Sequence, residues 1–505
     1  PPRSTLFPYT TLFRSLYGVD IDPGAVEIAK LRLWLSLVVD EDDIKQIKPL
    51  PNLDYKIVCG NSLLGVEKNL FNSDLFKKLE EIKPLYFNET NPTKKQEYKR
   101  RIDELISQIT SGHSEFDFEV FFSEVFHEKG GFDIIIGNPP YGADFTNHER
   151  NIYKTIYQYR DKDINSFVLF IEKSSALLAN KSVLCFIVPK NIIKTDDYEN
   201  IRKFSLDNFN IISLLDCGKA FDDVTGEMIS FLFHKPKKPD FLTSCLIYDD
   251  TINLSAMILQ DEFEKLDKYR FNIFLNKSNL SLIKKIKYDS HPLVELVDIY
   301  RGIETGKKDN LISDTVPKGR YKPIVAGKDV DKYRITNIRY IQYKPELINF
   351  KDENMYHVPK ILIRKIAPNI HATYDKEKLY TTQGVYLLLP KPNVNLYYLL
   401  AIINSNLIHW YYELYFNMGS NLTTNVTIEN LKNIPIRYAN DKIINSLKTI
   451  VEKILSITES HDFNNNNHQQ SKVNKLKNDI DNLVYSIYGL NIKEINFIEG
   501  EINDN

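Results

Sequence analysis

Cysteine, methionine and tryptophan are scarce in this sequence, with 4, 4 and 2 copies among 505 residues. Four scattered cysteines are too few for a disulfide scaffold, and none forms the CxxC pair that marks a zinc site or a dithiol redox motif. The longest apolar runs, such as residues 183–188, fall far short of the roughly 18 residues that span a membrane. We therefore expect no metal site, no membrane association and a reducing, cytoplasmic environment.

Neither sign of charge is in excess, since 65 Lys and Arg face 67 Asp and Glu and the net charge is -2. No global positive field therefore marks the chain as a nucleic-acid binder, and any basic surface has to be local. Hydrophobic residues make up 43% and charged residues 26%, which excludes a disordered or low-complexity protein. The length is typical of about three domains.

Methionine is also absent from the whole N-terminal part, and the first one is Met228. Residues 1–15 repeat Thr-Leu-Phe and have neither a signal-peptide apolar run nor a helical or strand periodicity. They resemble translated adapter sequence. We therefore expect residues 1–15 to be a non-native segment and the chain to be truncated at its N-terminus.

Between residues 16 and 240, strand and helix patterns alternate. Residues 133–136 (DIII) are typical of a strand that is buried on both faces of a parallel sheet. The alternation predicts a doubly wound α/β domain whose ligands lie beyond the carboxyl ends of the strands. The other predicted strands span 16–20, 55–59, 183–188, 211–215 and 228–234, and the predicted helices span 24–39, 93–109, 167–178 and 198–208.

The composition changes after residue 240. Residues 241–290 are expected to form a largely helical connector, and residues 439–505 a helical C-terminal region with helices over 440–458 and 472–488. Residues 291–438 contain short aromatic and β-branched strands with proline and glycine turns. This segment has 20 Lys and Arg against 14 Asp and Glu, a local excess of 6 positive charges.

The most informative residues are 137–141 (GNPPY), directly after the strand at 133–136. An exocyclic amine on an aromatic ring is a poor nucleophile because its lone pair is delocalised into the ring. The side-chain oxygen of Asn138 and the carbonyl of Pro139 offer two acceptors for its two hydrogens, and consecutive prolines hold the loop with little entropy to lose. Tyr141 is suited to stack on the face of a base.

Two earlier loops carry polar residues at strand ends. Asp20 ends the first strand, where a carboxylate is placed to bind ribose hydroxyls, and Asn61 follows the second strand, where its amide suits an adenine ring. Each signal alone also fits an ordinary turn. Together with residues 137–141, they form three polar loops at successive strand ends.

The segments GVDIDP (18–23), GNSLL (60–64) and GNPPY (137–141) resemble the gamma-group amino-methyltransferases, which are DNA adenine-N6 methyltransferases, in particular the type IIG restriction–modification and TaqI-like enzymes. The resemblance implies a Rossmann-like domain over residues 16–240 that uses S-adenosylmethionine. The family's Gly-rich first motif has no counterpart here, since only Gly18 precedes Asp20. The implied catalytic residues are Asn138, Pro139, Pro140 and Tyr141, the implied cofactor-binding residues are Asp20, Ile21, Asn61, Ser62 and Asn138, and the implied base-stacking residues are Tyr141 and Phe221.

The resemblance extends into residues 291–438, which resemble a TaqI-like specificity domain of mixed α/β fold. The segments that carry it are RGIETG (301–306), YKP (321–323), GKDV (327–330), KILIRK (360–365) and LAIINS (400–405). It implies a role for the basic excess, with Lys and Arg positioning a duplex by its phosphates. The expected DNA-binding residues are Arg301, Lys328, Arg364 and Lys365, although the last two also fit ordinary strand-face charges.

These observations predict a site-specific adenine-N6 methyltransferase of a restriction–modification system, with double-stranded DNA as partner and base flipping as mechanism. Three alternatives stay open. The chain is part of a bifunctional type IIG enzyme with an endonuclease domain upstream, it acts on RNA or on a protein glutamine, or it is a DNA-recognition remnant without activity. A separate or fused restriction endonuclease is a possible partner. The TaqI-like segment argues against the second alternative, and the intact GNPPY loop against the third.

Overall fold

The computed structural model describes residues 15–38, 53–65, 73–89, 91–110, 116–159, 164–222, 224, 226–306, 309–367, 369–418, 426–460 and 462–504. The expectation of a non-native segment at residues 1–15 falls almost wholly outside these ranges. The chain divides into two compact units, residues 1–271 and 272–505, which are described here one at a time. Among the described residues, no helix has the length and apolar character needed to cross a membrane.

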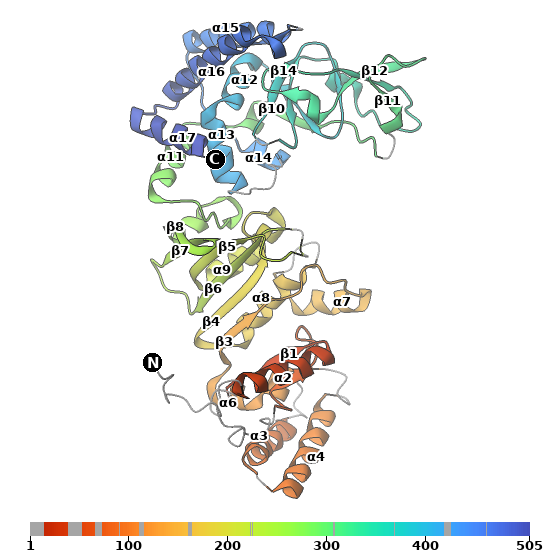
Figure 1. Cartoon of the computed structure of the whole chain (residues 1–505), viewed down its shortest axis with the longest axis vertical. Coiled ribbons are helices and arrows are strands. Elements are labelled where there is room, and N and C mark those ends of the chain that lie inside the picture. Colours follow the sequence, from red (N-terminus) through yellow and green to blue (C-terminus); the bar gives the residue numbers. More distant parts are fainter. Residues whose placement is uncertain are drawn as a thin grey trace. The chain divides into compact units, whose positions relative to one another are not determined.

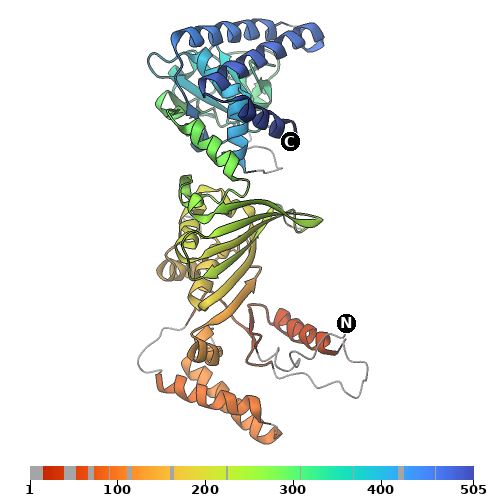
Figure 2. The ribbon, with the colours of Figure 1, turned by 90° about the vertical axis from the view of Figure 1, so that its left-hand side faces the viewer.

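A six-stranded mixed sheet forms the centre of the first unit, in the yellow and green part of the ribbon (Figures 1 and 2). Its strands, in spatial order, are β3 (Phe132–Gly137), β4 (Leu178–Pro189), β6 (Met228–Lys235), β5 (Asn210–Gly218), β7 (Leu242–Asp249) and β8 (Thr251–Leu259). β3 is parallel to β4 and β5 to β7, whereas β6 runs antiparallel to both of its neighbours. The α/β class is confirmed, with a mixed rather than an all-parallel sheet.

The prediction of a largely helical connector over residues 241–290 is wrong for its first part. Residues 242–259 form the hairpin β7–β8, which adds to the edge of the sheet. Asp250 makes the tight turn between the two strands with a φ of 54°, a left-handed conformation that Asp tolerates. Only α10 (Gln260–Glu264) and α11 (Lys277–Lys287) are α-helices in this region. The sheet therefore continues past the expected boundary at residue 240.

Strand β3 corrects a second expectation, that residues 133–136 are buried on both faces. The side chains of Ile134 and Ile136 are 68% and 79% exposed. Among the described strands, β3 pairs only with β4 and therefore lies at the edge of its sheet. Residues two apart in a strand point to the same face, so one face of β3 is open to solvent.

Three helices follow the sheet strands in this unit: α7 (Asn147–Ile156), α8 (Ser166–Leu177) and α9 (Glu199–Asn208). Most side chains of α8 are buried, from Ser166 at its first turn to Leu177 at its end. Thr146 and Glu149 form a capping box at the start of α7, which fixes where that helix begins.

A smaller sheet in the same unit pairs β1 (Gly18–Asp20) in parallel with β2 (Ile57–Cys59). The helix α2 (Pro23–Val38) follows β1, and the carboxylate of Asp22 caps it by accepting the amides of Gly24 and Ala25 at 2.6 and 3.1 Å. Beyond it, α3 (Ser73–Asn88) packs against α4 (Pro92–Ile109), whose buried residues are Ile102, Ile106 and Ile109. The remaining short helices of this part are α5 (Phe118–Phe121) and α6 (Ser123–Lys129).

The second unit contains two four-stranded sheets. The first has the order β10 (Val297–Arg301), β19 (Val385–Pro390), β16 (Lys360–Arg364) and β17 (Ala372–Asp375), and the second has the order β11 (Ile312–Ser313), β15 (Arg339–Gln342), β12 (Tyr321–Val325) and β18 (Tyr380–Thr381). One apolar cluster that includes Ile324, Ile341, Leu362 and Leu387 draws side chains from both sheets. The expected short strands of residues 291–438 are present, together with the buried helices α12 (Leu396–Asn404) and α13 (Asn406–Tyr412).

Long helices end the second unit, drawn in dark blue in Figure 1: α15 (Asp441–Thr458), α16 (Asn467–Ile487) and α17 (Ile492–Asp504). The helix expected over 440–458 is confirmed almost to the residue. The next helix begins at 467 rather than 472, because the side chain of Asn466 accepts the amide of Gln469 at 3.1 Å and caps it there. Residues 467–471 therefore form the first turn of α16.

Candidate active site

The loop at residues 137–141 lies at the carboxyl end of β3, where the sequence places it. Asn138 is exposed, and the hydroxyl of Tyr141 donates to its side-chain oxygen. The same hydroxyl lies 3.3 Å from the carbonyl of Ile187 on β4. Partial burial raises the pKa of Tyr141, so this residue stays a hydrogen-bond donor at neutral pH. The contact orients the Asn138 amide and leaves its oxygen a second lone pair for another donor.

Two further contacts hold this loop in place. The hydroxyl of Ser166, which is fully buried at the start of α8, donates to the carbonyl of Pro140 at 2.5 Å. At the other end of the loop, a side chain on Gly137 would meet the ring of Phe186 at 2.9 Å, so only glycine allows β3 and β4 to approach this closely. The loop is thus fixed from α8 and from β4. No sequence pattern predicts the contact between Ser166 and Pro140.

Asp20 and Asn61 lie at the ends of the paired strands β1 and β2. The amide of Gly60 donates to the carbonyl of Asp20 at 2.9 Å, so the two loops are adjacent. Asp20 is exposed, and one of its carboxylate oxygens accepts the amide of Asp22 at 2.8 Å. The other carboxylate oxygen is chemically suited to accept a hydrogen bond from a ribose hydroxyl. Ile21, which follows Asp20, is 69% exposed.

Asn61 also connects the loop after β2 to α7, the helix that follows the GNPPY loop. Its Nδ2 lies 3.3 Å from the hydroxyl of Tyr153 on α7, and its Oδ1 accepts the amide of Leu63 at 2.9 Å. The hydroxyl of Tyr157, the residue that caps the end of α7, donates to the carbonyl of Leu63 at 2.7 Å. These contacts keep residues 61–63, including Ser62, against α7. The role of Tyr153 and Tyr157 was not predicted, although both lie on one face of a helical pattern.

Phe221 was the residue expected to stack on a flipped base. It follows β5 and is 36% exposed. The stacking role of Phe221 stays a prediction.

A buried ionic cluster at the sheet edge near Tyr141 was not predicted. The ammonium of Lys190, directly after β4, lies 2.6 Å from Asp216 and 3.0 Å from Glu227, and its side chain is only 5% exposed. These two carboxylates stand at the end of β5 and just before β6. The cluster therefore ties together the ends of three strands. The hydroxyl of Tyr141 lies 3.3 Å from the carbonyl of Ile187, three residues before Lys190, so the loop and the cluster lie at the same end of β4.

The four basic residues expected to contact DNA lie in the second unit. Arg301 ends β10, Lys328 is exposed in a short turn after β12, and Arg364 and Lys365 lie at the end of β16. Backbone contacts bring these positions together around one turn at residues 381–384. The side chain of Arg364 donates to the carbonyl of Ile366 at 2.6 Å, which supports the alternative that this residue is in part structural.

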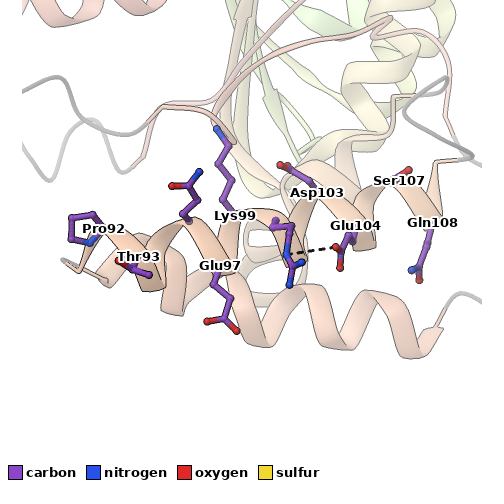
Figure 3. A pocket seen from close by; sticks show the side chains of 10 residues that line it. Pro92, Thr93, Glu97, Lys99, Asp103, Glu104, Ser107 and Gln108 are labelled. Atoms are coloured by element: carbon purple, nitrogen blue, oxygen red, sulfur yellow. Dashed lines mark ion pairs between the residues drawn. The ribbon is translucent and has the colours of Figure 1, made fainter.

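A surface hollow on α4 offers no competing site. Its lining residues all belong to that one helix (Figure 3), and Arg100 and Glu104 among them form an ion pair of 3.8 Å. Such mixed charges are typical of a solvated helix face. Within the described residues, no group of three or more His, Cys, Asp or Glu side chains is arranged to hold a metal ion.

Two family models match the chain. Residues 14–222 match the Eco57I restriction-modification methylase, and residues 322–436 match the TaqI-like C-terminal specificity domain. The first range contains the three polar loops and the mixed sheet up to β5. The second contains Lys328, Arg364 and Lys365. The two-part organisation that the motifs predicted is confirmed at the level of these families.

Curated relatives agree with this result. A protein of Methanocaldococcus jannaschii named "Putative type II restriction enzyme and methyltransferase" is 28% identical over 97% of this chain and 50% of its own length. The type II restriction enzyme and methyltransferase Eco57I of Escherichia coli is 28% identical over 46% of this chain and 20% of its own length. The type II methyltransferase HincII of Haemophilus influenzae is 25% identical over 65% of this chain and 80% of its own length. The chain thus spans about half of the first relative and a fifth of the second.

Among solved structures, the type IIL restriction–modification enzyme MmeI in complex with DNA covers 98% of this chain with a TM-score of 0.53 and 10% identity, a likeness of fold alone. By these motifs and relatives, the chain is similar to type II restriction–modification methyltransferases. It combines a domain that matches the Eco57I restriction-modification methylase with one that matches the TaqI-like C-terminal specificity domain.

Proposed function

We propose that this protein transfers a methyl group from S-adenosylmethionine to the N6 amine of adenine at a specific site in duplex DNA. The observation that carries the proposal is the GNPPY loop, which is fixed at the end of β3 with its acceptor residue Asn138 exposed. The relatives named as type II methyltransferases support the reaction class. The choice of adenine N6 rests on the resemblance to the gamma-group enzymes and on the chemistry of the loop.

The loop is suited to activate an amine. The Asn138 oxygen and the Pro139 carbonyl accept the two amine hydrogens, which turns the nitrogen lone pair out of conjugation with the ring. Tyr141 holds the Asn138 amide in orientation and presents its ring to the base. Ser166 fixes the Pro140 carbonyl, so the geometry of the acceptors is set before the base arrives. Because duplex DNA holds this amine within the base stack, the base has to be flipped out of the stack to reach the loop.

The residues at the ends of β1 and β2 fit the cofactor. The Asp20 carboxylate is exposed and retains acceptor capacity for ribose hydroxyls, with Ile21 offering apolar contact beside it. Asn61 and Ser62 are partly exposed and carry amide and hydroxyl groups suited to a purine. When bound, S-adenosylmethionine supplies an electrophilic methyl group. The chain's own part is to hold donor and acceptor in line, which is a matter of positioning.

The test is Asn138→Ala, assayed with labelled S-adenosylmethionine and duplex DNA. We expect methyl transfer to be lost while duplex binding stays within a few-fold, because the acceptor is removed and no buried contact is disturbed. Asn147→Ala, at an exposed asparagine in the first turn of α7, is the matched control and should transfer normally. Unchanged transfer in Asn138→Ala would refute the catalytic assignment.

The methylated nucleoside in the product identifies the target base. Enzymatic digestion of the methylated duplex and mass analysis of its nucleosides should give N6-methyladenine. N4-methylcytosine would keep the amine chemistry of the loop and refute adenine as the target, and label in protein or RNA alone would refute DNA as the substrate.

A second candidate function concerns restriction. The names of two relatives join a restriction enzyme and a methyltransferase. We therefore propose that methylation by this protein protects DNA from an endonuclease with the same target site, either fused to it or separate. Methylated duplex should resist that nuclease while unmethylated duplex is cut, and equal cutting of both would refute the pairing.

A further inference from the structure

The turn at residues 381–384, called here the clamped turn, is held by three other segments of the second unit. The amide of Ile303 donates to the carbonyl of Thr381 at 2.7 Å, and the amide of Thr382 donates to the carbonyl of Val325 at 3.0 Å. The amide of Lys365 donates to the carbonyl of Gly384 at 2.9 Å. Segments from β10, β12 and β16 thus meet at one short turn between β18 and β19.

Two glycines make this meeting possible. A side chain on Gly302 would lie 2.2 Å from the carbonyl oxygen of Thr382, and one on Gly327 would lie 2.7 Å from that of Gly384. Both positions therefore require glycine, because the obstacle is backbone and not a flexible side chain. Backbone packed this closely on both sides leaves the clamped turn little freedom to move.

One polar side chain projects from this rigid frame. Gln383 is exposed, and Arg301 holds it by donating to its side-chain oxygen at 3.2 Å and to its backbone carbonyl at 3.4 Å. The same guanidinium lies 3.3 Å from Glu304. The Gln383 side chain keeps its NH₂ group as a donor and one lone pair of its oxygen as an acceptor for a ligand. Arg301 is therefore engaged within the protein and orients Gln383.

The surroundings of Gln383 are basic. Lys328 is exposed and follows Gly327, which packs against Gly384 of the clamped turn. The backbone amide of Lys365 donates to the carbonyl of Gly384. Lys351 reaches the carbonyl of Arg301 at 2.8 Å. Charges of this kind position a nucleic-acid backbone without reading its sequence, whereas a glutamine amide matches the donor and acceptor of adenine in the major groove.

We propose that Gln383 reads an adenine of an A·T pair in the target duplex, and that Arg301 is its positioning residue rather than a phosphate contact. This inference rests on the proposed function, in that it assumes duplex DNA as the ligand. It assigns sequence reading to one side chain on the clamped turn and phosphate contact to Lys328 and Lys365.

The experiment is selection of bound duplexes from a random library by the full chain. Wild type should enrich a short sequence with an A·T pair at one position, preferred by about fivefold to a hundredfold over other pairs. Gln383→Ala should lose the preference at that position alone, while the dependence of affinity on salt stays unchanged. Lys328→Ala should lower affinity for all sequences and reduce the salt dependence by about one ion.

Arg301→Lys separates the two roles of that residue, because it keeps the positive charge and removes the planar contact to Gln383. Loss of the same A·T preference supports positioning, and a wild-type preference refutes it. An unchanged selection by Gln383→Ala would overturn the proposal for Gln383. Wild type that enriches no sequence at all would instead refute the proposed function. Melting temperature checks that each variant is folded.

Discussion

Two apolar strands, one in each unit, have nearly the same character and opposite burial. β16 (KILIR) has three fully buried aliphatic side chains, Ile361, Leu362 and Ile363. β3 (FDIIIG) exposes Ile134 and Ile136 by 68% and 79%. β16 lies between β17 and β19, whereas β3 has β4 as its described neighbour. An apolar run thus predicts a strand, but the number of neighbours and layers around it decides whether the strand is buried.

The same comparison holds for charge. Lys360 and Asp375, both with 0% side-chain exposure, form an ion pair of 2.6 Å at the start of β16. Burial lowers the pKa of Lys360, an effect that Asp375 opposes. Asp133, the second residue of β3, is exposed and pairs at the surface with Lys129 at 3.0 Å. Deep burial makes the former pair costly to break, whereas the latter is worth little.

The largest effect on stability is expected from Lys360→Met. It leaves Asp375 buried without its counter-charge and should cost about 3–5 kcal/mol. Denaturant unfolding measures the loss. The double variant Lys360→Met, Asp375→Asn removes the buried charge and keeps one of the two side-chain acceptors for the amides of Glu377 and Leu379, so it should recover part of the loss. A single variant as stable as wild type would show that the pair is not buried as described.

Next in size is the contrast between Leu362→Ala and Ile136→Ala. Truncation at the buried position should cost about 2–5 kcal/mol, and truncation at the exposed one less than about 1 kcal/mol. Because the two units need not unfold together, hydrogen exchange of peptides covering β16 and β3 is the suitable measurement. Equal losses would mean that β3 is covered in solution.

A smaller effect concerns association. The open edge and the exposed isoleucines of β3 offer a surface for strand pairing between copies. Sedimentation at increasing concentration should show self-association of the chain, and Ile136→Lys should reduce it by placing a charge on that face. Lys129→Ala, which removes a charge beside the same strand, is expected not to reduce it. Association that is identical in both variants would exclude β3 as the contact.

The smallest effect is the pH dependence of the second unit. Burial lowers the pKa of His409 to about 4 and raises that of Asp481 to about 6. As pH falls from 6.5 to 4, His409 becomes protonated in the unfolded chain but not in the folded one, so the free energy of unfolding decreases. Over nearly the same interval Asp481 becomes protonated in the folded chain before it does in the unfolded one, so the free energy of unfolding increases. The two contributions largely cancel in wild type. His409→Gln removes the first, so its melting temperature relative to wild type should rise from pH 7 to pH 5, and parallel profiles would contradict this assignment.

Much of the catalytic half is predictable from local pattern. Asn138 and Tyr141 follow a recognisable strand, and Asp20 and Asn61 follow two others, so spacing alone places them at strand ends. The contacts that fix them come from residues distant in sequence. Ser166 reaches Pro140, and Lys190 joins Asp216 and Glu227, through tertiary packing that leaves no periodic signal.

The errors have physical causes of the same kind. The hairpin at residues 242–259 was missed because its outer strand alternates weakly and leaves apolar residues such as Ile252 and Leu254 60% exposed, as an edge strand does. The burial of β3 was misjudged because a sequence does not state how many strands will flank it. In the second unit, the contact between Arg301 and Gln383 was not predicted, because the two residues are far apart in the sequence.

The clamped turn also bears on how such a protein changes over time. Its conformation depends on backbone hydrogen bonds and on Gly302 and Gly327, and not on the identity of residue 383. Under the proposed role of Gln383, a substitution there alters the groups presented to the duplex and leaves the supporting frame intact. On that proposal, a lineage acquires a new target sequence through a single codon, without passing through an unstable intermediate.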